Sequence, residues 1–145
     1  MSDWRSNLLT QPSDYAGLVR TLKRVAVLGI KTEAQSGEPA FYVAEYLARA
    51  GIEVVPVPVY YPATTEILGQ PVVRKVVDAG AVDLVDVFRR PRDVALHLDD
   101  LLAAKPPVVW LQSGIRNDEV AEALARAGIK VVQDRCLMVE HRRFA

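Results

Sequence analysis

Three arginines lie where a predicted buried strand ends and a helix begins, in the stretch Phe-Arg-Arg-Pro-Arg at residues 88–92. The planar guanidinium of arginine presents a fork of N–H donors that matches the oxygens of a phosphate. In open parallel sheets, ligands bind beyond the carboxyl ends of the strands. Phe88, Arg89 and Arg90 are therefore candidates to line a phosphate site. The alternative is that these arginines only begin a solvated surface helix.

A second candidate for anion binding is the loop after the first predicted strand. Gly29, Ile30 and Lys31 follow an apolar run, and Ser36 and Gly37 stand where we expect a helix to begin. The free N–H groups and the positive dipole end of such a helix attract anions, and Lys31 adds a positive charge. This pattern predicts a phosphate-binding loop, with an ordinary polar loop as the alternative.

The same loop lacks the fingerprint of a dinucleotide site. That fingerprint is G-x-G-x-x-G, together with an acidic residue at the end of the second strand that binds the ribose hydroxyls. Only Gly29 is in place, and the second strand runs into an apolar, proline-rich segment at residues 56–62. Because proline fixes its φ angle, this segment is stiff; it offers a wall for a flat base but no carboxylate for a ribose. NAD is therefore disfavoured as the ligand and stays an alternative.

The search for catalytic residues yields few candidates. His97 lies between two leucines on a predicted helix and is expected to be structural or partly exposed, whereas His141 lies in a charged C-terminal run expected at the surface. Cys136 follows an arginine, which can lower a thiol pKa, but no general base is placed beside it, so a small buried filler is preferred. Trp110 is expected in the core. No Ser-His-Asp set, P-loop or metal-ligand spacing can be assembled, so we predict no catalytic residue and no metal site.

Short apolar runs and amphipathic helices must position these residues. Continuous apolar strands joined by helices are typical of a parallel sheet covered on both faces. Right-handed crossovers then give an α/β fold with a single doubly wound, mainly parallel, Rossmann-like sheet of about five core strands. If the first strand is central, the strand order reverses between the ends of the first and fourth strands. The predicted strands are residues 25–28, 53–57, 84–88, 108–111 and 129–132, with 72–73 as a candidate edge strand, and the predicted helices are residues 12–22, 37–50, 91–104 and 117–127.

Capping signals support two of these helices. Asn117 is expected to cap the helix at residues 117–127, because a short polar side chain can accept a hydrogen bond from the free N–H groups of the first turn. Ser13 or Asp14 is expected near the start of the leading helix.

Composition and charge limit the class of protein. With 145 residues, the chain is long enough for one domain and too short to expect two. We predict a single domain over residues 1–145, with a leading helical segment at residues 1–23. Formal net charge is zero, so no general attraction to nucleic acid or to an anionic membrane is implied. No apolar run approaches the roughly 20 residues that span a bilayer, and no signal core is present, so we expect a cytoplasmic protein.

Several blocks along the chain resemble a known family. They are VAVLG, VAEYLARAGIEVVPV, EILGQPV, VDLVDVFRRP, VVWLQSGIRNDEVAEALARAGIKVV and DRCLMVEH, and together they extend over roughly residues 24–143. In this order they resemble the stand-alone CoA-binding proteins of bacteria and archaea. That family is similar in turn to the CoA-binding N-terminal domain of the succinyl-CoA synthetase alpha subunit and of ADP-forming acyl-CoA synthetases.

The resemblance implies a Rossmann-like domain that binds coenzyme A, or an acyl-CoA, at the carboxyl ends of the parallel strands without catalysis of its own. It implies that the first loop approaches the phosphates, that the second strand end meets the nucleotide and that the third strand end flanks the cofactor. Two departures from the family pattern fall in this site: the first loop lacks the usual Gly-Ala-Ser and has Glu38 where a base is usual, and Pro58-Val59 replaces Asn-Pro. The resemblance implies Gly29, Ile30, Lys31, Val57, Pro58, Phe88 and Arg89 as cofactor-binding residues, and the residue patterns described above add Ser36 and Arg90.

Two other functions stay open at this stage. The chain is alternatively a non-catalytic subunit or fragment of an acyl-CoA synthetase, which would need a partner to supply a phosphorylated histidine and a nucleotide site. It is otherwise an NAD-binding module. In each case we expect a small-molecule ligand and no binding to nucleic acid or to a membrane. The sequence leaves open whether the chain has a protein partner or forms a homo-oligomer.

Overall fold

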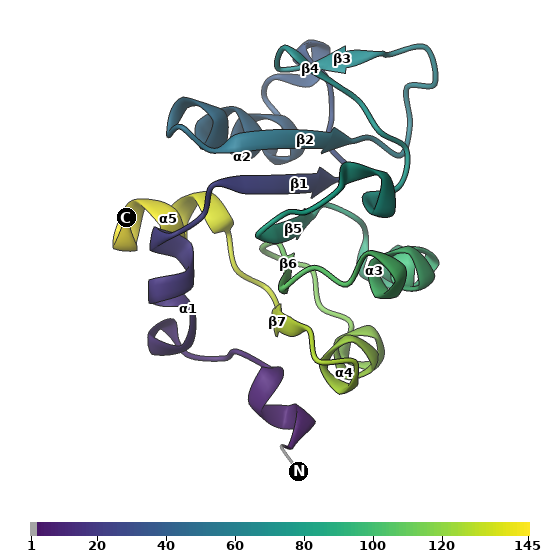
Figure 1. The fold of residues 1–145 in the computed structure, drawn as a ribbon. Coiled ribbons are helices and arrows are strands. Elements are labelled where there is room, and N and C mark those ends of the chain that lie inside the picture. Colours follow the sequence, from purple (N-terminus) through teal and green to yellow (C-terminus); the bar gives the residue numbers. More distant parts are fainter. Residues whose placement is uncertain (1–2) are drawn as a thin grey trace.

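A five-stranded parallel sheet forms the middle of the molecule (Figure 1). The computed structural model describes residues 3–145, and residues 1 and 2 of the predicted leading segment lie outside the described residues. The strand order is β2-β1-β5-β6-β7, and every pairing is parallel. This arrangement confirms the predicted α/β fold class. The strands are β1 Arg24–Leu28, β2 Glu53–Val57, β5 Leu84–Val87, β6 Val108–Leu111 and β7 Lys130–Val132.

The strand order reverses at β1. From β1 the chain crosses to β2 on one side, and the next strand of the sheet, β5, pairs with the other side of β1. The switch point therefore lies between β1 and β5, which are the first and third strands of this sheet in chain order. The expectation that it lies between the first and fourth strand ends was wrong, because β5 and not β6 pairs with β1. In register, Leu28 lies beside both Val57 and Val87.

Helices cover both faces of the sheet. Figure 1 shows α1 and α5 on one side and α3 and α4 on the other. Residues of α2 belong to the same buried cluster as those of α1 and α5. Among the described residues, no helix is long and apolar enough to cross a bilayer. The helices are α1 Pro12–Arg20, α2 Pro39–Arg49, α3 Leu98–Ala104, α4 Asp118–Arg126 and α5 Leu137–Phe144, and 3-10 helices occur at Trp4–Asn7, Glu33–Gln35, Val76–Ala79 and Pro91–His97.

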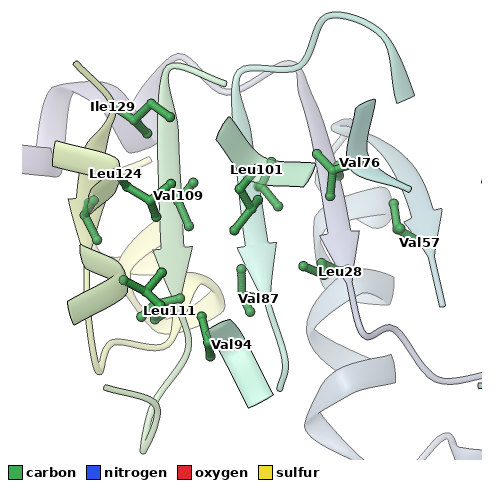
Figure 2. Packing of buried hydrophobic residues seen from close by; sticks show 14 of the residues in the cluster. Leu28, Val57, Val76, Val87, Val94, Leu101, Val109, Leu111, Leu124 and Ile129 are labelled. Carbon is green, nitrogen blue, oxygen red and sulfur yellow. The ribbon is translucent and has the colours of Figure 1, made fainter. Parts of the chain in front are cut away.

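Alternate residues of each strand enter two separate cores. Along β5, Val85 and Val87 pack toward α3 and α4, whereas Leu84 packs toward α1, α2 and α5. This alternation follows from the period of two in a β-strand and explains why the strands carry apolar residues on both faces. Figure 2 shows the first core, where aliphatic side chains of the sheet meet Leu101 and Leu124 from the helices.

Both edges of the sheet are covered. At the β7 edge, the Leu9 N–H donates to the Val131 carbonyl oxygen at 2.8 Å. At the β2 edge, the Val73 N–H donates to the Pro56 carbonyl oxygen at 3.0 Å. Residues 72–73 nevertheless form no strand: the neighbouring hairpin pairs β3 (Glu66–Ile67) with β4 (Gln70–Pro71), so that prediction was wrong.

Local signals explain where several helices begin. The Asn117 side chain accepts a hydrogen bond from the Val120 N–H at 3.1 Å, which confirms it as the cap of α4. In α1 the cap is Gln11, and Asp14 accepts from the N–H groups of Thr10 and Gln11.

Two helices differ from the prediction. The segment predicted as one helix over residues 91–104 is a 3-10 helix at Pro91–His97 followed by α3. The C-terminal helix α5 was not predicted, because its charged last turn was interpreted as a surface run.

Candidate functional site

A cleft of about 840 Å³ opens at the carboxyl ends of the parallel strands, around the switch point between β1 and β5. Its volume falls within the range of roughly 300–1,000 Å³ that is usual for ligand sites. We call it the switch-point cleft. It is lined by Gly29, Ile30, Lys31, Glu38, Pro39, Ala40, Tyr42, Val59, Tyr60, Tyr61, Phe88, Arg89, Arg90, Pro91, Gln112, Ser113, Ile115, Cys136, Met138 and Val139.

Gly29 is positioned at the base of the cleft by the two neighbouring strands. Its N–H donates to the Val57 carbonyl oxygen at 2.8 Å, and the Phe88 N–H donates to the Leu28 carbonyl oxygen at 2.8 Å. Its φ angle is 84°, and a Cβ there would overlap the Phe88 carbonyl oxygen. Only glycine fits, since the position combines a left-handed backbone with a close backbone approach.

Arg89 reaches the cleft from the end of β5. Its Nε donates to His97 Nε2 at 3.0 Å, and its Nη1 donates to the Tyr60 hydroxyl at 3.3 Å. The guanidinium carbon also lies 5.6 Å from the centroid of the Tyr60 ring, which is within the range of a cation–π contact. No carboxylate forms an ion pair with Arg89 among residues 3–145. Its positive charge is therefore held by neutral partners.

The other two predicted cations of the cleft do have acidic partners. Lys31 Nζ lies 3.6 Å from a carboxylate oxygen of Glu38, and Arg90 Nε donates to Asp93 at 2.9 Å. The hydrogen bond from Arg90 lowers the pKa of Asp93. Both pairs are at the surface, where such ion pairs contribute little stability. Part of the positive charge of Lys31 and Arg90 is thus balanced before any ligand binds.

The segment after β2 approaches the cleft through its aromatic residues. Val57 and Pro58 are buried beneath it and do not line the cleft, whereas Tyr60 and Tyr61 do. The Arg74 guanidinium donates to the carbonyl oxygens of Tyr60 and Tyr61 at 3.1 and 3.0 Å and fixes this segment. The stiff wall expected from the prolines therefore presents tyrosines rather than Val57 and Pro58.

The loop between β1 and α2 differs from the expectation in one respect. The helix begins at Pro39 with Glu38 as its cap, and not at Gly37. Ser36 closes the preceding 3-10 turn, is exposed and does not line the cleft. The structure thus brings together at the cleft six of the nine predicted residues, which are Gly29, Ile30, Lys31, Phe88, Arg89 and Arg90.

Each histidine is partly buried and hydrogen-bonded to another side chain. His97 is half-buried, and burial, followed by the Arg89 charge, lowers its pKa, while Asp100 and Asp93 oppose this. His141, expected at the surface, is partly buried: its Nδ1 lies 2.8 Å from the Tyr46 hydroxyl, and burial lowers its pKa.

The prediction for Cys136 was wrong, and the prediction for Trp110 was confirmed. Cys136 was expected as a buried filler, but it is partly exposed, immediately precedes α5 and lines the cleft. Its place follows from α5, which brings Met138 and Val139 to the same wall. Trp110 is fully buried, as predicted, and its indole N–H donates to the Arg135 carbonyl oxygen at 2.8 Å.

A buried acidic residue in β5, the middle strand of the sheet, was not predicted from the sequence. Asp86 has no exposed surface, and within the described residues its carboxyl oxygens have no hydrogen-bond partner. In register it lies between Val27 and Trp110, so it faces the core formed with α1, α2 and α5. Burial raises the pKa of Asp86 well above the usual range, which favours the protonated carboxyl because the charged form loses its hydration.

Comparison with known proteins identifies the chain. Residues 23–142 match the sequence model of a family of CoA binding domains. The chain belongs to this family. YneT, an uncharacterized protein of Bacillus subtilis (strain 168), is 30% identical over 125 residues, which are 86% of this chain and 89% of YneT. The resemblance inferred from the sequence is therefore confirmed.

Solved structures show the same fold. The structure of cell-free ID.343 from Thermus thermophilus is 41% identical, with a TM-score of 0.83, and the match covers 93% of this chain and 99% of that chain. The dinucleotide forming acetyl-coenzyme A synthetase 1 of Ca. Korarchaeum cryptofilum is 21% identical with a TM-score of 0.63, and the match covers 80% of this chain and 27% of that chain. At that identity the second likeness concerns the fold alone.

Proposed function

We propose that this chain binds coenzyme A, or an acyl-CoA, in the switch-point cleft. The observation that carries the proposal is the position of the cleft. It lies at the carboxyl ends of the neighbouring strands β1 and β5, where the strand order reverses, which is the usual ligand site of a doubly wound sheet. Membership of the CoA binding domain family supports coenzyme A as the ligand.

The lining residues match the chemistry of coenzyme A. Arg89 offers guanidinium N–H donors, which suit the phosphates. Phe88, Tyr60 and Val59 provide apolar and aromatic surface for the adenine and the pantetheine chain. Gln112 and Ser113 add neutral polar groups that can bind the pantetheine amides. Such a mainly apolar cleft with a few polar groups is typical of a small-molecule site.

We propose binding without catalysis of its own. His97 Nε2 already accepts a hydrogen bond from Arg89, and the Asp86 carboxyl is enclosed in the core. Both titratable groups therefore serve the fold and the position of Arg89 rather than a reacting bond. A thiol at Cys136 lies on the wall of the cleft, where a bound ligand would cover it.

Isothermal titration calorimetry with the purified chain tests the proposal. CoA, NAD and ATP are titrated separately under the same buffer and salt conditions. We expect saturable binding of CoA at a single site and markedly weaker binding of NAD and ATP. Saturable binding of NAD or ATP, with no saturable binding of CoA up to millimolar concentration, would contradict the proposal.

A further inference from the structure

His97 contacts the guanidinium of Arg89, but unlike Arg89 it does not line the switch-point cleft. It is the last residue of the 3-10 helix Pro91–His97 and precedes α3. Its Nε2 accepts the hydrogen bond from Arg89 Nε at 3.0 Å. The Tyr60 hydroxyl, at 3.3 Å from Arg89 Nη1, gives a longer contact from a side chain that is 58% exposed. Of the two side chains that hydrogen-bond Arg89, His97 therefore makes the shorter contact and is the less exposed.

This hydrogen bond fixes the protonation state of the imidazole. Arginine has only donors, so His97 Nε2 must carry a free lone pair. The ring is then neutral, with its proton on Nδ1. A protonated imidazole has two N–H donors and no acceptor, and it would place a second positive charge against the guanidinium. The contact between Arg89 and His97 exists only while His97 is neutral.

The charges around His97 come from several elements. Arg89 and Asp93 approach from the β5 end and the 3-10 helix, and Asp100 approaches from α3, where its carboxylate accepts from the N–H groups of Val76 and Val77. Burial is the largest influence and lowers the pKa of His97, so the ring is neutral near pH 7. His97 also lines a second cavity of about 420 Å³, whose charged lining residues are Arg74, Lys75, Asp99 and Asp100.

We propose that His97 is a positioning residue for Arg89: the neutral imidazole holds the guanidinium at the switch-point cleft, and protonation of the imidazole releases it. Affinity for the phosphates of CoA then falls as the pH falls through the pKa of His97. This inference rests on the proposed function, because the phosphate ligand is CoA. It adds a pH response to that site.

The test compares CoA affinity of the wild type and two variants at about pH 8 and about pH 5, the range in which histidine changes charge. His97→Gln keeps an acceptor, the amide oxygen, at about the place of Nε2 but does not titrate. His141→Gln is the matched control, since His141 is the only other histidine and does not line the cleft. Circular dichroism at both pH values establishes that each protein is folded.

We expect the wild type and His141→Gln to lose affinity by about fivefold or more between the two pH values, in the usual range of coupling between sites. Between the two pH values, His97→Gln should lose clearly less affinity than the wild type, because its amide acceptor does not titrate. Titration of the CoA phosphates affects all three proteins equally and cancels in this comparison. Equal losses in all three would overturn the inference and leave CoA binding intact.

Nitrogen-15 NMR of the ligand-free wild type separates the two proposals. At neutral pH we expect the shifts of His97 to show a proton on Nδ1 and none on Nε2. A proton on Nε2 would overturn the positioning role whatever CoA does. No saturable CoA binding at pH 8 would overturn the proposed function and, with it, the pH response.

Discussion

Gly29 and Phe88 meet backbone to backbone where β1 and β5 end, and a Cβ on Gly29 would overlap the Phe88 carbonyl oxygen. The same two strand ends are tied by the hydrogen bond from the Phe88 N–H to Leu28. The two residues form the base of the switch-point cleft, and Arg89 follows directly. The position of the phosphate-binding candidates thus depends on a contact that admits no side chain.

Replacing Gly29 with alanine should destabilise the fold by about 1–3 kcal/mol or more, because a left-handed backbone is strained for alanine and the Cβ has no room. Urea unfolding followed by circular dichroism measures the change. Gly37→Ala is the matched control in the same loop: its Cβ would meet nothing within 4 Å, and a change within about 0.5 kcal/mol is expected. Equal stability of the two variants would contradict this account of Gly29.

Replacing Arg89 with alanine should weaken CoA binding about tenfold or more, since a hydrogen bond to a charged group contributes about 1.5–3 kcal/mol. Calorimetry at neutral pH measures the effect. Arg92→Ala removes the same charge from an exposed residue that does not line the cleft, and its affinity should change little. If both variants lose affinity equally, Arg89 acts only through the overall charge of this surface.

Asp86 should make the stability of the fold depend on pH. Burial raises the pKa of Asp86 in the folded state above the unfolded value of about 3.9. The stability that the protonated carboxyl contributes is therefore fully present below the unfolded pKa and is lost as the pH rises through the folded pKa. Against Asp86→Asn, the wild type should lose up to about 1.4 kcal/mol per pH unit over this window.

Unfolding free energies of both proteins at several pH values give that slope. Asp78→Asn, at an exposed position, is the control and should follow the wild type. A constant difference between the wild type and Asp86→Asn across the window would show that the carboxyl is not held protonated.

Cys136 offers a reporter of occupancy, because it is the single cysteine of the chain and lines the cleft. Acetyl-CoA, which has no free thiol to consume the reagent, should slow its alkylation by iodoacetamide about tenfold at ten times the dissociation constant. Intact-protein mass spectrometry follows the reaction. An unchanged rate with saturating acetyl-CoA would mean that the ligand does not cover this wall.

The fold was predictable because each strand is a short apolar run and each turn carries its own signal. Asn117 illustrates this: a cap is a local property, and its hydrogen bond to Val120 needs no distant partner. The position of the cleft followed from the parallel sheet. The strand order was less predictable, since pairing of β5 with β1 depends on contacts between segments far apart in the sequence.

The rest of the site depended on such distant contacts. Cys136 reaches the cleft because α5 packs beside α1 and α2. That helix was not predicted, because the charged residues of its last turn were interpreted as a surface run. Tyr60 lines the cleft because Arg74 holds its carbonyl, from 14 residues away. His97 was interpreted as structural, and only its contact with Arg89 shows how it bears on the cleft.

A crystal structure of the chain with saturating CoA tests the central claim most directly. We expect density for CoA in the switch-point cleft, with its phosphates beside the Gly29 loop and Arg89 and its adenine or pantetheine chain against Tyr60 and Phe88. CoA bound outside this cleft, with the ends of β1 and β5 free of ligand, would contradict the account.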